Sequence, residues 1–243
     1  MSSLLTVKDL SISFAGIKAV QNLNFTIEHG EVLGLIGPNG SGKSTTINLI
    51  SGAYTPLSGE MVFDGHLLIK KQTIAQRSHL GIGRTFQTPK PFGHMTVYNN
   101  IFTILLQRYG FKDADKHTKE ILALSKLDYL SNTLSSKLSI EKRKWMDLAR
   151  VLAAEPKLIM MDEVMAGLNP NEMEASLEFI REISRQGIAI LFIEHVMKAV
   201  VSICQRTIVL NGGRFLCEGT PEEVLSNPSV IEAYIGGKKH AKN

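Results

Sequence analysis

The chain has 243 residues, of which 44% are hydrophobic, enough for one large packed domain or two small ones. Its net charge of +4 is compatible with binding to phosphates or to a membrane surface and does not distinguish between them. Two cysteines are too few for a disulfide framework, so a reducing cytosol is the favoured location. The longest apolar run, residues 188–193, falls short of the roughly 18 residues of a membrane span, and the first residues lack a signal-peptide pattern.

Residues 4–27 alternate loosely between apolar and polar side chains. Gly16 and the pair Gln21-Asn22 interrupt the alternation, which predicts several short strands, antiparallel to one another. A small antiparallel sheet is therefore expected before the first motif of the chain.

A glycine-rich loop follows an apolar run at residues 32–36 and precedes residues 46–50, which can continue as a helix. It matches the pattern Gly-x-x-x-x-Gly-Lys-[Ser/Thr] of the phosphate-binding loop. The loop consists of Gly37, Pro38, Asn39, Gly40, Ser41, Gly42, Lys43, Ser44 and Thr45. Its glycines let backbone N–H groups converge on a phosphate, and the helix start adds a positive dipole end. Lys43 would reach the outer phosphates and Ser44 would hold Mg²⁺; the alternative is a glycine-rich turn that binds nothing.

Phe14 lies in the strand region before this loop. A single aromatic in a strand is usually a core residue, whereas an exposed one can stack on a nucleotide base, with Val20 packed beside it. The residues alone leave both interpretations open.

After the loop, residues 61–63 form another short strand between turn-like segments, and residues 82–86 read as a strand that ends at Gln87. Pro89 and Pro91 then predict an irregular loop.

The sequence becomes helical from Thr96 to about Leu152. Thr96 can cap a first helix with an apolar stripe, residues 116–127 fit a second, and a third begins near Ser139. This stretch reads as a helical block inserted into an α/β chain, without linkers on either side.

The apolar strand at residues 158–161 ends in Asp162 and Glu163. Buried acids are costly unless they meet a cation or take part in proton transfer. With a phosphate loop upstream, we interpret Asp162 as a Mg²⁺ ligand and Glu163 as the group that polarises the attacking water. Solvated carboxylates at a strand end are the alternative.

Further signals follow in the last third of the chain. Asn169 starts a helix that continues with Pro170, and Thr220 caps a last helical segment. A central strand at residues 188–193 ends beside His195, at the sheet edge where open α/β folds bind ligands, so a functional role is favoured over a structural one.

The order of these motifs resembles the ATP-binding subunit of ABC transporters over essentially the whole chain. The segments that resemble the branched-chain amino acid importer branch are residues 83–87, 166–170 and 218–224. The resemblance implies an α/β fold: a P-loop NTPase (RecA-like) core with an N-terminal antiparallel β subdomain and an inserted α-helical subdomain. It also implies one domain over residues 1–243, with the helical subdomain at about 90–153 and a C-terminal helical extension at about 220–236.

The resemblance also implies roles for individual residues. Phe14 would stack on adenine, and Gln87 would touch Mg²⁺ or water and sense the membrane partner. Glu163 would be the catalytic base, and His195 the switch that contacts the γ-phosphate. Two such subunits would close head to tail, each binding ATP between its own phosphate loop and the signature segment of the other.

The signature segment departs from the family pattern Leu-Ser-Gly-Gly-Gln. After Leu138 this chain has Ser139, Ile140, Glu141 and Lys142. Glu141 replaces the second glycine, and like charges about 4 Å apart cost on the order of 4 kcal/mol at an effective dielectric of 20. Alternatively, Glu141 is an ordinary first-turn acid that favours the helix dipole and points away from ATP. A smaller departure is Val164, where a proline commonly follows the Asp-Glu pair.

These features predict an ATPase that drives import of a small solute, such as a branched-chain or other amino acid. Its expected partners are a second ATP-binding subunit, preferably a different chain with an intact signature, integral membrane permease subunits and, indirectly, an extracytoplasmic solute-binding protein. The expected location is the cytoplasmic face of the inner membrane, and no nucleic acid is expected.

Three alternatives remain: a non-transport ABC ATPase, a P-loop GTPase switch and a module that binds ATP with little turnover. The chain lacks a second cassette and an Asn-Lys-x-Asp base-reading motif, which argues against the first two. Glu141 keeps the third open.

Overall fold

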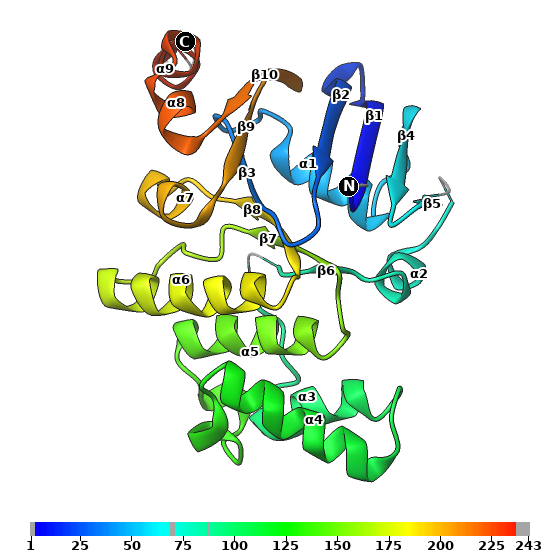
Figure 1. Ribbon diagram of the computed structural model, residues 1–243, viewed down its shortest axis with the longest axis vertical. Helices are drawn as coiled ribbons and strands as arrows, with labels where there is room; N and C mark the ends of the chain where they lie inside the picture. Colours follow the sequence, from blue (N-terminus) through cyan, green and yellow to red (C-terminus); the bar gives the residue numbers. More distant parts are fainter. Residues whose placement is uncertain (1–2, 69–70, 87, 237–243) are drawn as a thin grey trace.

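A six-stranded sheet forms the centre of the computed structural model, which describes residues 3–68, 71–86 and 88–236 (Figure 1). From one edge to the other its strands are β10 (Arg214–Gly219), β9 (Arg206–Asn211), β3 (Val32–Ile36), β8 (Ala189–Ile193), β7 (Leu158–Asp162) and β6 (Ile82–Arg84). All run parallel except β10, which is antiparallel to β9. Every residue of β3, β7 and β8 is buried, as expected of parallel strands covered on both faces.

The parallel strands bring the predicted motifs to one edge of this sheet. Since β3, β8 and β7 are neighbours and parallel, their carboxyl ends lie side by side. The phosphate loop follows β3, His195 comes two residues after β8, and Asp162 ends β7. This is the edge at which open α/β sheets bind ligands.

The N-terminal region forms a second, antiparallel sheet of β2 (Ile17–Ile27), β1 (Leu5–Phe14), β4 (Ser58–Phe63) and β5 (His66–Leu67), in that order. The expectation of several short strands was wrong, because β1 and β2 span ten and eleven residues. Their pairing continues past the predicted interruption through register shifts, with Asp9 and Asn22 at positive φ. The polar pair therefore marks a bulge and not a break.

Nine helices occur in the described ranges. They are α1 (Lys43–Ser51), α2 (Ile74–His79), α3 (Val97–Leu105), α4 (Phe111–Leu124), α5 (Ile140–Leu152), α6 (Pro170–Arg185), α7 (Met197–Ile203), α8 (Pro221–Ser226) and α9 (Pro228–Gly236). In addition, Asp128–Leu130 and Ser135–Lys137 form short 3₁₀ turns. Figure 1 shows α3, α4 and α5 gathered at one end of the molecule, away from the N-terminal sheet.

Side-chain caps fix most of the helix starts that the sequence predicted. Thr96, Ser139, Asn169 and Thr220 each accept a backbone N–H from the first turn of the helix that follows. Such a cap stabilises a helix by about 1 kcal/mol relative to alanine.

Helix α4 does not begin where it was expected. We predicted residues 116–127, but the helix spans Phe111–Leu124. Its N-cap, Gly110, provides no side-chain hydrogen bond, so the sequence carries no start signal. The Phe111 ring meets Phe102 edge-on at 5.2 Å between centroids, and Lys126 at φ +52° follows the end of the helix.

Two apolar clusters hold the layers together, one between the two sheets and α1, the other between the central sheet and the helices of the opposite face. Arg77 of α2 is fully buried although it is charged, and its Nη1 donates to the carbonyls of Leu49 and Ile50, at the carboxyl end of α1. This arginine ties α2 to the helix that carries the phosphate loop. Within the described ranges, no helix combines the length and apolarity required to cross a membrane.

Candidate active site

The phosphate loop joins β3 to α1 in a backbone conformation that requires glycine. Gly37, Gly40 and Gly42 have φ angles of +149°, +76° and +105°. A Cβ on Gly37 would lie 2.1 Å from the carbonyl oxygen of Leu210, and one on Gly42 would lie 2.6 Å from that of Ala19. The close approach of β9 and β2 to the loop therefore excludes a side chain at both positions.

Lys43 closes the loop from inside. Its side chain is 6% exposed, and Nζ donates to the carbonyls of Gly37 at 2.8 Å and Pro38 at 3.1 Å. Burial lowers the pKa of Lys43, and the nearby carboxylates of Glu163 and Asp162 oppose that shift. The ammonium group is thus held by the loop, within electrostatic range of both acids that the sequence singled out.

A polar cavity of about 240 Å³ opens above this loop. Residues 39–45 form one side of it, and Ala19, Glu163 and His195 complete the lining. The cavity therefore joins the phosphate loop with two of the three predicted catalytic residues.

Glu163 and His195 are in direct contact at the edge of the cavity. His195 Nε2 lies 2.9 Å from Glu163 Oε1, and both side chains remain partly exposed. Glu163 adopts a left-handed conformation at φ +53°, and its N–H donates to the carbonyl of Ile193 at 2.9 Å. This bond joins the ends of β7 and β8. It thereby brings Glu163 close to His195, which lies 32 positions later in the sequence.

Asp162 lies deeper than Glu163, 8% exposed at the end of β7. Its Oδ2 is 3.6 Å from Nη2 of Arg84, the last residue of β6. Burial raises the pKa of Asp162, and the charge of Arg84 opposes this shift. The carboxylate is thus within electrostatic range of two cations, Arg84 and Lys43.

Phe14 and Val20 have different surroundings. Phe14 is 42% exposed, and its ring contacts Tyr54 edge-on at 5.1 Å, leaving an aromatic surface accessible. Val20 is 1% exposed and packs beneath the loop, whereas its neighbour Ala19 lines the cavity. Gln87, the third predicted catalytic residue, lies outside the described residues.

The predicted signature segment forms the start of α5. Ser139 accepts the N–H of Lys142 at 3.3 Å, and Ile140 is 64% exposed. The side chain of Glu141 is only 12% exposed and lies 3.4 Å from Nζ of Lys142. That ammonium group in turn sits 3.6 Å from the centre of the Trp145 ring. Glu141 is therefore folded against its own helix and paired with a neighbouring cation.

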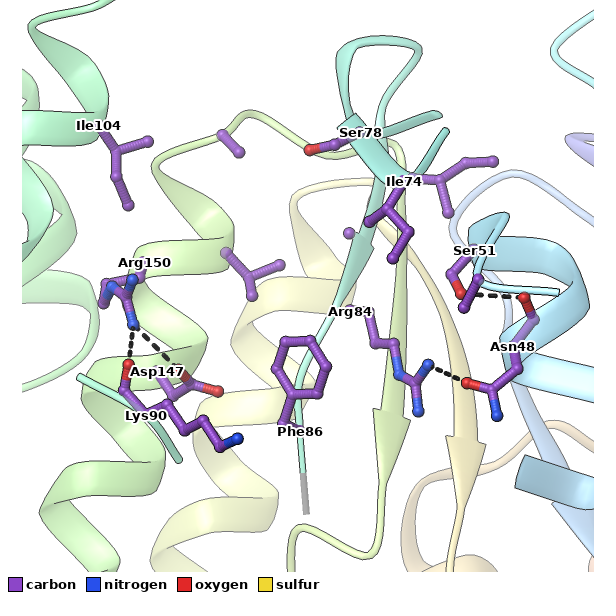
Figure 2. A pocket seen from close by; sticks show the side chains of 15 residues that line it. Asn48, Ser51, Ile74, Ser78, Arg84, Phe86, Lys90, Ile104, Asp147 and Arg150 are labelled. Carbon is purple, nitrogen blue, oxygen red and sulfur yellow. Dashed lines mark hydrogen bonds and ion pairs between the residues drawn. The ribbon is translucent and has the colours of Figure 1, made fainter. Parts of the chain in front are cut away.

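A second, larger cavity of about 550 Å³ lies between α1 and α2 on one side and α5 on the other (Figure 2). Figure 2 shows Phe86 between Arg84 on one side and the pair Asp147–Arg150 on the other. Phe86, next to Gln87, is 53% exposed. The Nε atoms of Arg84 and Arg150 are buried without a hydrogen-bond partner among the described residues.

Sequence reasoning missed three side chains near the site. Glu194, 2% exposed, accepts the N–H of Met165 at 2.8 Å, and Lys144 donates to the turn that follows Glu163. The hydroxyl of Tyr234 on α9 is buried beside the backbone of Gly37. Each of these three side chains lies beside backbone that is far away in the sequence, so no local sequence pattern predicts its position.

Comparison with known proteins identifies the family to which a chain with these motifs is similar. The family model "ABC transporter" matches residues 20–166, and "Branched-chain amino acid ATP-binding cassette transporter" matches residues 216–240. The chain is 36% identical to the high-affinity branched-chain amino acid transport ATP-binding protein LivG of Escherichia coli K12, covering 96% of this chain and 98% of that protein.

Two further relatives broaden the comparison. The lipopolysaccharide export system ATP-binding protein LptB of Haemophilus influenzae is 31% identical, covering 96% of this chain and 98% of that protein. The crystal structure of a nucleotide-free ATP-binding cassette from an ABC transporter has a TM-score of 0.86 and 31% identity, covering 97% of this chain and 100% of that one. The family and the fold class that the motifs predicted are confirmed, and the chain belongs to the ATP-binding cassettes, the ATPase subunits of ABC transporters.

Proposed function

We propose that this cassette hydrolyses ATP in the 240 Å³ cavity, with Glu163 as the base for the attacking water. The observation that carries the proposal is the 2.9 Å contact of Glu163 with His195 in the cavity that the phosphate loop lines. A carboxylate that can reach a water molecule beside a bound γ-phosphate has the position of a general base. His195 orients this carboxylate in the absence of nucleotide and can turn to the γ-phosphate when ATP is bound.

The chain offers oxygen ligands for Mg²⁺ in the same region. Ser44 is the second residue of α1, and Asp162 is a buried carboxylate near the ammonium of Lys43. Hydroxyl and carboxylate oxygens are the donors that Mg²⁺ prefers, so these residues fit the ion, together with the predicted ligand Gln87. Bound Mg²⁺ would neutralise charge on the phosphate oxygens.

Substitution of Glu163 tests the role of the base. Glu163→Gln keeps the shape of the side chain and removes its capacity to take a proton. We expect ATP to bind and remain unhydrolysed, so that the protein purified after incubation with ATP retains ATP and not ADP. Hydrolysis at the wild-type rate would refute the assignment.

We further propose that the functional unit is a dimer with a different cassette. In such a pair the phosphate loop of this chain faces an intact partner signature, and the ATP of the partner faces Ser139–Lys142. Glu141 brings a negative charge to that start of α5, and Lys142 offsets part of it. Turnover of the isolated chain and of the mixture with its partner cassette would separate this arrangement from a homodimer.

The 550 Å³ groove is our candidate for the contact with the membrane subunits. It combines an exposed aromatic, Phe86, with the cations Arg84, Lys90 and Arg150. A helix with an apolar face and an acidic residue fits such a surface. Phe86→Ala should lose co-purification of integral membrane subunits from membranes, whereas Phe215→Ala, an exposed phenylalanine on β10, should keep it.

The substrate class follows from the relatives and not from the site. The LivG relative and the C-terminal match support import of branched-chain or other amino acids. We propose that the cassette works at the cytoplasmic face of the inner membrane. The LptB relative serves a different cargo at a similar identity, as expected if other subunits select the solute. Identification of the co-purified membrane subunits, followed by uptake of labelled leucine by cells with and without this chain, tests the assignment.

A further inference from the structure

The turn that follows Glu163 is held by side chains that belong neither to the phosphate loop nor to the turn itself. Glu163 is in the left-handed region, which an L-residue rarely adopts. The next residue is Val164, so no proline ring restricts the chain at that point. The bond from the Glu163 N–H to the carbonyl of Ile193 and the bond from the Ala166 N–H to the carbonyl of Glu163 hold part of this turn.

Two charged side chains add to these backbone bonds and hold the residues that follow Glu163. Glu194 Oε1 accepts the N–H of Met165 at 2.8 Å, and Lys144 Nζ donates to the carbonyl of Val164 at 3.0 Å and to that of Ala166. The turn is thus held through one donor and two acceptors, from the end of β8 and from α5.

The carboxyl of Glu194 is nearly inaccessible, at 2% exposure, so its bond to Met165 is protected from competing water. The same residue directly precedes His195, which contacts Glu163 at 2.9 Å. Lys144 comes from α5, two residues after the signature segment. The pair therefore connects the predicted base, its histidine partner and the helix that carries the signature.

We propose that Glu194 and Lys144 are positioning residues, which fix the turn 163–166 and thereby hold the carboxylate of Glu163 at the phosphate cavity. Through Lys144, a displacement of α5 is transmitted to the base. This inference rests on the proposed role of Glu163 as the base, and it adds residues that do not touch the nucleotide.

The charges around Glu194 give the pair a recognisable pH signature. Burial raises the pKa of Glu194 to about 7, against the N–H groups of Met165 and His195 and the charge of Lys144, while Glu163 raises it further. Burial also lowers the pKa of Lys144, and Glu194 opposes that shift. The neutral carboxyl of Glu194 accepts a weaker hydrogen bond from the Met165 N–H than the carboxylate does. The turn should therefore be held most strongly at pH values above the pKa of Glu194.

Amide hydrogen exchange of the isolated chain tests the restraint without relying on turnover. In Glu194→Ala the Met165 amide should exchange roughly tenfold faster, while amides of β3 keep their protection. Glu194→Gln retains an acceptor oxygen, so protection should persist and lose its change with pH near neutrality. Glu174→Gln, on the outer face of α6, serves as the matched control.

Steady-state ATPase assays of the complex purified from membranes test the catalytic consequence. We expect Glu194→Ala and Lys144→Met to lower kcat by about tenfold with nucleotide affinity unchanged, and Lys144→Arg to restore most of the rate. A merely structural role would reduce affinity and folded protein as well.

The outcomes are separable. Wild-type exchange at Met165 and wild-type kcat in Glu194→Ala, beside an inactive Glu163→Gln, overturn the inference and leave the proposed function standing. Full turnover of Glu163→Gln overturns both. If Glu194→Ala does not fold, Glu194→Gln decides: a flattened pH dependence of Met165 exchange supports the proposal, and an unchanged one contradicts it.

Discussion

Two helix starts in this chain, those of α1 and α5, are proposed to face a phosphate, and they are built differently. Helix α1 begins at Gly42 without a side-chain cap, after a loop in which three glycines have positive φ. Helix α5 begins at Ser139, whose hydroxyl accepts the N–H of Lys142. Its first turn also carries an acid, Glu141.

Because of this difference in capping, the N–H groups at the start of α1 remain open to an anion, whereas those at the start of α5 are partly bonded already. At α1 the loop presents backbone N–H groups, and Lys43 adds a positive charge. At α5 one N–H is already used by the cap, and the charge of Glu141 weakens the positive end of the dipole for an incoming phosphate. In the proposed dimer, the start of α1 binds ATP through its own loop, whereas the start of α5 meets only the ATP that the opposing chain holds.

The largest expected effect concerns the geometry of the open site. Gly37→Ala places a Cβ 2.1 Å from the Leu210 carbonyl, so the loop must move away from β9. We expect nucleotide binding to be lost in equilibrium dialysis. Gly16→Ala is the matched control, because Gly16 also has a positive φ but no atom within 4 Å of its Cβ position. Equal binding by both variants would contradict the claim that close packing shapes the loop.

The second effect concerns the charge of the open site. Lys43→Met keeps the length of the side chain and removes the ammonium group that bonds to Gly37 and Pro38. We expect kcat to fall by at least about 100-fold, the usual loss of a group that stabilises developing negative charge. Lys119→Met, an exposed lysine of α4, should leave the rate unchanged. A loss below about tenfold would show that Lys43 serves the loop and not the phosphate.

The third effect concerns the negative charge of Glu141 at the start of α5. Glu141→Gln removes the negative charge and keeps the side-chain volume, so the isolated chain should gain about tenfold in turnover if this charge weakens its signature. Glu172→Gln at the start of α6 is the control, since it removes a first-turn acid elsewhere. Unchanged turnover would favour the alternative in which Glu141 points away from ATP.

The smallest effect concerns the cap of α5. Ser139→Ala removes the acceptor for the Lys142 N–H and should lower the free energy of unfolding by about 1 kcal/mol in urea titration. Thr96→Ala, at the start of α3, should cost a similar amount. A Ser139→Ala variant as stable as the wild type would mean that Glu141 and the helix dipole suffice to start α5.

The sequence predicted those parts of the site whose functional residues are consecutive in the chain. The phosphate loop and the pair Asp162–Glu163 are contiguous, so their spacing carries the chemistry. The expectation that Glu163 and His195 serve one site needed only the rule that parallel strands end at one edge. Their direct contact at 2.9 Å depends on rotamers that no spacing encodes.

The parts that the sequence did not reveal depend on long-range packing. Arg77 reads as a surface residue in a short helix, yet it is fully buried against the end of α1. Lys144 and Glu194 bond to backbone that is 20 to 29 residues away. Helix α7 escaped prediction because Val196 provides no cap and the helix has only seven residues.

The most direct test of the unequal sites is the ATP turnover per molecule of the isolated chain, measured over a wide range of protein concentration with Glu163→Gln as the blank. If Glu141 impairs the signature, turnover stays low and rises little with concentration, and an added partner cassette with an intact signature raises it. Robust, cooperative turnover by the isolated chain at high concentration would contradict the account.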